Sequence, residues 1–154
     1  MKARELMTQD PRTCEPGHDL RCAIEIMKAE DTGIVPVTEG NGEARVVGVA
    51  TDRDIALVLG QRDARPSEVQ VGDLMNREVV SVPPDADVAE VSRKMQKAQV
   101  RRVLVVEDRR LVGIISTADL ARASARREGQ MGEELESVME KVSEDTRHPR
   151  LGLP

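Results

Sequence analysis

The chain has 154 residues, a length that suits one domain or two closely packed halves. With 39% hydrophobic residues, 33% charged residues and a formal net charge of -5, it is predicted to be globular and water-soluble, and a basic nucleic-acid-binding surface is disfavoured. The chain has no Phe, Tyr or Trp, which excludes the aromatic stacking surfaces of RNA-recognition sheets, most single-strand binders and cation cages.

Two copies of one pattern cover most of the chain. A shift of 68 residues aligns the tripeptide ELM with DLM, as in Met7 with Met75, and aligns VPV with VLV. After a gap of three residues the shift becomes 65, which aligns VVGV with LVGI. Internal repetition of this kind predicts two copies of one structural unit. The predicted parts are a first repeat at 3–59, a polar linker at 60–70, a second repeat at 71–124 and a C-terminal extension at 125–154.

Each repeat is predicted to contain the same elements in the same order. A short extended piece that ends at a proline precedes an amphipathic helix, because apolar residues recur at helical spacing from Leu20 and from Val88. Two strands joined by a turn follow, and a second helix closes the repeat. The first repeat is predicted to have an extended piece at 12–15, a helix from 20, strands at 34–38 and 46–50, and a helix at 51–59. The second repeat is predicted to have an extended piece at 79–82, a helix from 88, strands at 103–106 and 111–115, and a helix at 116–124.

The C-terminal extension carries a short apolar stripe at helical spacing, formed by Leu135, Val138, Met139 and Val142. The stripe predicts a short helix that packs on the repeats or on a second subunit, followed by a frayed tail. No apolar run reaches the roughly 20 residues of a membrane span, and the first residues lack the apolar stretch of a secretion signal. We therefore expect a cytoplasmic protein with no membrane partner.

The most specific motif is a strand followed at once by hydroxyl-x-x-Asp, found as VVGVATDRDI and LVGIISTADL. The free N–H groups and dipole at a helix start favour a phosphate, and the hydroxyl of Thr51 or Ser116 adds a donor. One turn later, Asp54 or Asp119 offers a carboxylate that accepts hydrogen bonds from the two hydroxyls of a ribose. The same spacing is also nearly a capping box, which marks only a helix start. Its occurrence at the same place in both repeats favours the ligand-binding interpretation.

These motifs resemble the tandem cystathionine-β-synthase (CBS) domain pair, also called a Bateman module, over nearly the whole chain. The resemblance rests on ELM and DLM, on GIVPV and RRVLV, and on the two strand-to-helix motifs. It implies an α/β (α+β) fold in which each CBS motif is a small three-stranded sheet with two helices, and the two motifs are related by a pseudo-twofold axis. Similar stand-alone bacterial proteins commonly bind adenosine derivatives in two clefts and dimerise through their helices.

The resemblance also implies which residues line the two clefts. In the first cleft, Thr13, Cys14, Ile34, Val35 and Pro36 would enclose the base, with Thr51 toward the phosphates and Asp54 on the ribose. In the second cleft, Ser81, Val82, Arg102, Val103 and Leu104 would enclose the base, with Ser116, Thr117 and Asp119 at the phosphate and ribose positions. Candidates for the phosphates are Arg53 and either Arg101 or Arg102, because a guanidinium offers paired donors. Leu104 departs from the family's usual proline, and Arg102 from a small apolar residue, so Arg102 either completes a phosphate site or crowds the base.

Other candidate sites are weaker. Cys14 and Cys22 are too few for a disulfide scaffold and are interpreted as small, reduced hydrophobic residues. Together with His18 they have the spacing of metal ligands, and His18 and Cys22 would share a helix face, but the set has three ligands and we predict no metal site. GNGEAR, between the first two strands, lacks the last glycine of a dinucleotide fingerprint and is predicted to be a turn. No nucleophile–base pattern or phosphate-binding Walker A loop is visible, so we predict no enzyme.

The leading hypothesis is a non-enzymatic, energy-sensing regulatory module. It would bind AMP, ADP, ATP, S-adenosylmethionine or an NAD-type nucleotide as a regulatory ligand, require no cofactor, form a homodimer and signal to an unknown protein partner. The alternative is a dimeric interaction scaffold whose clefts are degenerate and bind nothing. Nucleotide binding by the purified protein distinguishes the two hypotheses.

Overall fold

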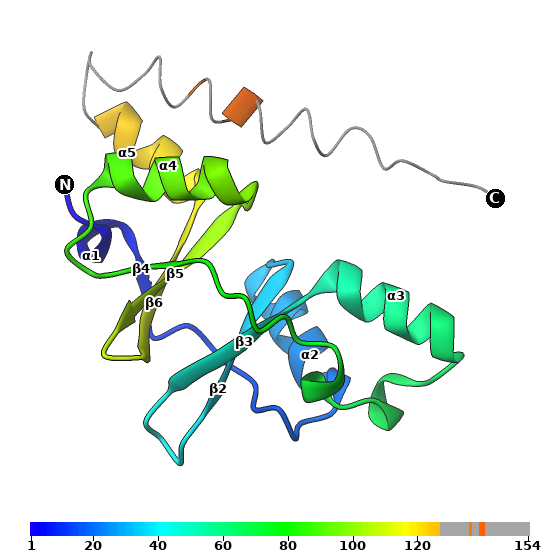
Figure 1. The fold of residues 1–154 in the computed structure, drawn as a ribbon. Helices are drawn as coiled ribbons and strands as arrows, with labels where there is room; N and C mark the ends of the chain where they lie inside the picture. The colour runs from blue at the N-terminus through cyan, green and yellow to red at the C-terminus, as the bar shows by residue number, and fades with distance from the viewer. Residues whose placement is uncertain (127–135, 137–138, 141–154) are drawn as a thin grey trace.

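The structure, a computed structural model, describes residues 1–126, 136 and 139–140 (Figure 1). The helical stripe predicted in the C-terminal extension therefore lies almost entirely outside the described residues. The helices are α1 (Ala3–Leu6), α2 (Leu20–Glu30), α3 (Asp52–Arg62), α4 (Val88–Ala98) and α5 (Thr117–Arg126), and the two short 3-10 helices are η1 (Pro66–Glu68) and η2 (Val71–Asp73). The strands are β1 (Thr8–Gln9), β2 (Ile34–Glu39), β3 (Arg45–Thr51), β4 (Ser81–Val82), β5 (Arg102–Glu107) and β6 (Arg110–Ser116).

The predicted helices and hairpins are confirmed, with small differences at their ends. Helix α3 passes through Gly60 and ends three residues later than predicted, at Arg62, where Asp63 takes a left-handed φ of 48°. The extended piece predicted at 12–15 forms only a single parallel bridge, between Cys14 and Val37. Among the described helices, none is long and apolar enough to cross a membrane.

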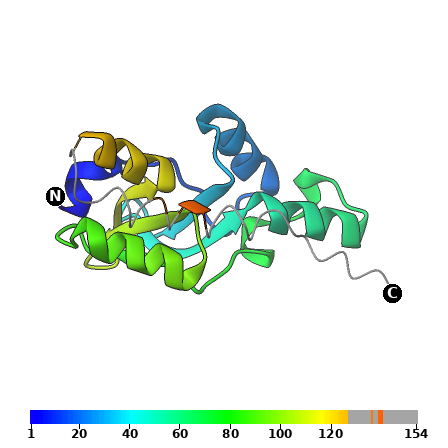
Figure 2. The same ribbon diagram turned by 90° about the horizontal axis from the view of Figure 1, so that it is seen from above.

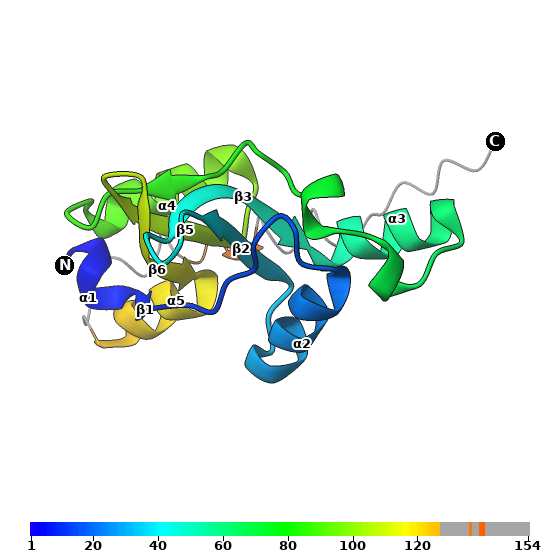
Figure 3. The same ribbon diagram turned by 90° about the horizontal axis from the view of Figure 1, so that it is seen from below.

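The strands form one mixed sheet with the order β2-β3-β6-β5-β4, and β1 lies beside β6. Within each repeat the two long strands pair along their length as an antiparallel hairpin. The two hairpins meet at one pair, Arg45 with Arg110, near their turns. Figures 2 and 3 show α4 and α5 in one half of the molecule and α2 and α3 in the other, with the strands between them. Each hairpin therefore belongs to its own half, and the two hairpins share little backbone pairing.

Each half has its own aliphatic core, as expected for a chain without aromatic residues. The core of the first half packs α2 and α3 on β2 and β3 and includes the fully buried Leu20 and Val37. The core of the second half packs α4 and α5 on β5 and β6 and includes the fully buried Met95 and Leu120. A third, smaller cluster around Leu104 contains residues of both repeats. This cluster forms the apolar contact between the halves.

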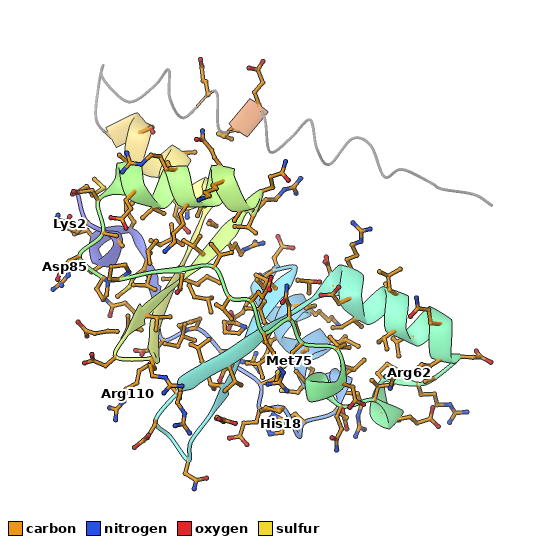
Figure 4. All side chains as sticks on the ribbon, in the orientation of Figure 1. Lys2, His18, Arg62, Met75, Asp85 and Arg110 are labelled. Carbon is orange, nitrogen blue, oxygen red and sulfur yellow. The ribbon has the colours of Figure 1, made fainter. Side chains whose placement is uncertain are left out.

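The segment that begins each repeat packs on the other half. We call residues 1–9 and 69–76 the lead segments. The first one donates backbone hydrogen bonds from Ala3 to Ala86 at 2.8 Å and from Arg4 to Pro84 at 3.0 Å, both in the second half. Figure 4 shows Lys2, from the first lead segment, close to Asp85 of the second half. The lead segments are thus exchanged between the halves.

The second lead segment repeats these contacts on the first half. Val71 donates to the His18 carbonyl and Gly72 to the Pro16 carbonyl, both at 2.8 Å. Val69, at the end of the predicted linker, is only 1% exposed and lies in the core of the first half with Val71 and Met75. The pseudo-twofold relation of the two repeats therefore extends to the backbone hydrogen bonds of the exchanged segments.

Candidate ligand-binding pocket

The two hydroxyl-x-x-Asp motifs lie at the starts of α3 and α5, and both make capping contacts. Thr51 accepts a hydrogen bond from the Asp54 N–H at 3.2 Å, and its hydroxyl donates to the Asp54 carboxylate at 2.7 Å. In the second repeat, the Asp119 carboxylate accepts from the Ser116 N–H at 2.7 Å and from the Ser116 hydroxyl at 2.6 Å. The structural role of the motif is therefore present in both repeats.

Capping does not use all the acceptor capacity of these carboxylates. The capping contacts of Asp54 and Asp119 fall on the Oδ2 oxygen of each, while the Oδ1 of Asp119 accepts from Arg122. An ionised carboxylate has about four acceptor positions, so a cap leaves room for a ligand hydroxyl. Both aspartates are partly exposed, which keeps them accessible.

A pocket of about 420 Å³ lies between the halves, and we call it the Ile34 pocket. Ile34 and Pro36 come from β2, whereas Arg102 comes from β5 and Ile114 from β6, so both repeats contribute walls. This volume is within the range of small-molecule sites. The remaining lining residues are Thr8, Gln9, Asp10, Pro11, Arg12, Ile26, Glu30 and Thr32.

The Ile34 pocket has apolar walls and a mixed charged rim. Arg12 lies 4.0 Å from Glu30, an ion pair of which more than a third of each side chain is exposed. Arg102 adds a second guanidinium and Asp10 a second carboxylate. The two arginines come from different halves, so an anion held by both would link the halves.

Strand alternation separates the predicted base-pocket residues into two groups. Ile34 and Pro36 face the pocket, whereas the intervening Val35 is fully buried in the core of the first half. In β5, Arg102 lines the pocket, whereas Val103 is buried in the core of the second half. Consecutive residues of one strand cannot all contact one ligand, because their side chains alternate between faces.

The start of α3 adjoins the Ile34 pocket. Thr51 pairs with Ile34 across the β2–β3 hairpin, and the Asp52 N–H donates to the Gly33 carbonyl at 3.0 Å. The carboxylate of Asp54 therefore lies near the end of β2 whose residues line the pocket, although it is not itself part of the lining.

A second pocket, of about 260 Å³, is lined by Ser81 and by two arginines, Arg77 and Arg109. Ser116, Thr117 and Asp119 line neither this pocket, the Ile34 pocket nor the third one, around Met7 and Leu111. Arg102, assigned to the second cleft from the sequence, lines the Ile34 pocket instead. The residues predicted for the second cleft are thus spread over separate places.

The other predicted site residues line none of these three pockets. Thr13 accepts a hydrogen bond from the Thr38 hydroxyl at 3.1 Å, and Arg53 is exposed on α3. Cys14, Val82 and Leu104 are buried in hydrophobic clusters. Sequence reasoning missed the segment 8–11, which reaches the pocket through the pairing of β1 with β6. No local sequence pattern signals that pairing, because it joins the chain start to a strand over 100 residues later.

Cys14, His18 and Cys22 form a compact cluster in the first half. Their ligand atoms all lie within 4.8 Å of one another. His18 lies just before α2 rather than on it, because Asp19 caps the helix by accepting from the Arg21 N–H at 3.0 Å. Burial raises the pKa of the Cys14 thiol, and its hydrogen bond with Cys22 raises it further.

The chain is similar to several proteins along most of its length. It is 34% identical over 143 residues to YlbB of Bacillus subtilis, covering 93% of this chain and 92% of that protein. The crystal structure of Hypoxic Response Protein I with two coordinated zinc ions is 31% identical, with a TM-score of 0.70, and covers 79% of this chain and 98% of that one. The CBS domain pair of protein MJ0100, solved with methylthioadenosine and S-adenosyl-L-methionine, is 26% identical, with a TM-score of 0.71, over 83% of this chain and 98% of that one.

The family profile described as CBS domain matches the sequence twice, at residues 3–60 and 71–126. These matches cover both repeats, and the solved relatives share the mixed α/β fold. The chain therefore belongs to the CBS domain family and carries two copies of that domain in tandem.

Proposed function

We propose that this protein is a non-enzymatic regulatory module that binds an adenosine nucleotide in the Ile34 pocket. The observation that carries the proposal is the composition of that pocket, in which apolar walls from both repeats are combined with one arginine from each half. The pocket suits a flat purine, because Ile34, Pro36 and Ile114 offer aliphatic surfaces in a chain that has no aromatic ring to stack on a base. The two guanidiniums suit phosphate oxygens.

The ribose is assigned to Asp54. Its carboxylate lies at the start of α3, beside the pocket, and retains acceptor positions beyond the cap with Thr51. The bound nucleotide would extend from the aliphatic walls, past the helix start, to Arg12 and Arg102. The relative MJ0100, whose CBS pair was solved with two adenosine derivatives, supports this ligand class.

Regulation follows from the construction of the pocket from two halves. Backbone pairing between the hairpins is limited to Arg45 with Arg110, so small shifts of one half against the other change the distance between the two pocket walls. A ligand shifts such an equilibrium only by its difference in affinity for the two arrangements. We propose that the protein acts as a homodimer in the cytoplasm. Exposed residues on its surface, such as Leu57 on α3, would pass the shift between the halves to a protein partner.

Calorimetric titration with AMP, ADP, ATP, S-adenosylmethionine and NADH tests the proposal. One ligand is expected to bind saturably, and Arg102→Ala should weaken it at least about 10-fold, since hydrogen bonds to charged groups contribute about 1.5–3 kcal/mol. The matched control is Arg101→Ala, which changes the neighbouring exposed arginine outside the pocket lining. Asp54→Ala should also weaken binding, with exposed Asp52→Ala as its control. Flat titrations with all five ligands, or equal losses in both arginine variants, would refute the assignment.

A dimeric scaffold without a ligand is the second candidate function. The observation that favours it is the complete internal cap of the second repeat, where Ser116, Asp119 and Arg122 bond to one another and the first two line none of the three pockets. It predicts a stable dimer by light scattering that no nucleotide in the panel affects.

A further inference from the structure

We infer that Cys14, His18 and Cys22 form a binding site for one zinc ion. Their ligand atoms, two sulfurs and one imidazole nitrogen, already lie within 4.8 Å of one another. In a tetrahedral site with Zn–S bonds of about 2.3 Å, neighbouring ligand atoms are about 3.8 Å apart. Each pair therefore needs to close by about 1 Å at most, which side-chain rotation supplies.

Backbone hydrogen bonds hold all three residues in place without a metal. Cys14 donates to the Pro36 carbonyl at 3.1 Å and accepts from the Thr38 N–H at 2.9 Å, which fixes it beside β2. The Cys22 N–H donates to the Asp19 carbonyl at 3.1 Å in the first turn of α2. The His18 carbonyl accepts from Val71 of the second lead segment at 2.8 Å. The site is thus assembled from a strand-like segment, a turn and a helix start before any ion binds.

The imidazole of His18 is oriented by its own turn. Its Nδ1 accepts a hydrogen bond from the Glu15 N–H at 3.1 Å, and the His18 N–H donates back to the Glu15 carbonyl at 3.1 Å. Coordination through Nδ1 replaces one exposed hydrogen bond by a metal bond, and coordination through Nε2 follows from turning the ring over. Figure 4 shows His18 on the lower side of the first half, away from the second half.

Burial changes stepwise across the cluster. Cys14 is fully buried, Cys22 is partly buried and His18 is exposed, so an ion bound by all three lies at the surface with its fourth position toward solvent. Two thiolates, one imidazole and one open position form a donor set that zinc accepts, and each thiol releases its proton as the metal–sulfur bond forms. The three-ligand count that argued against a metal from the sequence is thus compatible with a site that has an open position.

Cobalt titration of the reduced, chelator-treated full chain tests the site. Two cysteines are the only thiols of the chain, and it has no Phe, Tyr or Trp, so a thiolate-to-cobalt charge-transfer band in the near ultraviolet reports on this cluster alone. The expected result is one Co²⁺ per chain, with this band and the intense visible bands of a tetrahedral ion, both abolished when Zn²⁺ displaces the cobalt.

Three variants decide the assignment. Cys22→Ser, at a partly buried position where folding should tolerate the change, is expected to weaken zinc binding at least about 10-fold, because even outer-shell changes weaken metal sites by that amount. His18→Ala should do the same, and the matched control His148→Ala, at the only other histidine, should bind zinc like the parent. Absence of stoichiometric thiolate–cobalt bands in the parent, or equal bands in Cys22→Ser, would overturn the site. The metal titrations contain no nucleotide, so neither result tests the proposal that the Ile34 pocket binds one.

Discussion

Replacing Gly113 by alanine is expected to destabilise the protein by displacing a lead segment. A Cβ at Gly113 would lie 2.4 Å from the Sδ and 2.7 Å from the Cγ of Met7, whereas ordinary carbon contacts begin at about 3.5 Å. Met7 therefore has to move by about 1 Å or leave its place against the second-half core. Overpacking of this kind costs about 1–3 kcal/mol, which is the loss expected here because Met7 is only partly buried.

The repeat supplies a second test of the same reasoning. A Cβ at Gly48, the equivalent position of the first repeat, would lie 2.9 Å from the backbone carbonyl of Asn76. That carbonyl accepts from the Val49 N–H at 2.9 Å and cannot turn aside like a methionine side chain. Gly48→Ala should therefore destabilise the fold at least as much as Gly113→Ala.

Urea unfolding followed by far-ultraviolet circular dichroism measures both effects, since the chain has no tryptophan for fluorescence. Gly60→Ala is the control with the opposite sign: it lies within α3 with nothing near its Cβ and should stabilise the fold by about 0.5–1 kcal/mol. Met7→Ala in the Gly113→Ala background should restore part of the loss, with a coupling of about 0.5–3 kcal/mol. The clash is refuted if the free energy of unfolding of Gly113→Ala lies within about 0.5 kcal/mol of the parent's and the effects of Gly113→Ala and Met7→Ala simply add in the double variant.

Two further predictions concern ionisable groups. With a disulfide-exchange reagent at mildly alkaline pH, Cys22 should react first and Cys14 slowly, because Cys14 is buried and burial raises the pKa of its thiol. The Cys22→Ser variant should lose only the fast phase of the reaction. If both thiols react in a single fast phase, Cys14 is not buried as described. The Lys2 hydrogen bond lowers the pKa of Asp87 from its ordinary value of 3.8, so its small contribution to stability is present above that value and is lost as the pH falls through the lower folded-state pKa. Titration of Asp87 by carbon NMR should show this shift in the parent and not in Lys2→Ala.

Local sequence patterns predicted the helices and strands well, because helix caps and the spacing of apolar residues act over only a few neighbouring residues. Leu20 and Val88 begin amphipathic helices after Asp19 and Asp87, and two short apolar strands joined by a turn follow in both repeats. The polar composition of the linker did not reveal buried Val69, because one apolar residue among charged ones carries no periodic signal.

The candidate site was only partly predictable, for a geometric reason. The resemblance named Ile34, Pro36 and Arg102, which line one pocket, together with Val35 and Val103, which strand alternation turns into the cores. Two further lining residues, Thr8 and Gln9, come from the first lead segment, whose position depends on long-range pairing that the sequence pattern does not contain.

The exchange of the lead segments means that the unit repeated in the sequence is not the unit that can be cut out. A fragment of residues 1–68 would carry a lead segment with no partner and would lack Val69, Val71 and Met75 from its own core. A fragment of residues 10–76 would keep the first half complete. During synthesis, the first half likewise stays unfinished until the ribosome has released residue 76, just inside the second repeat, so the first half completes its core with a piece of the second repeat before the rest of that repeat has emerged.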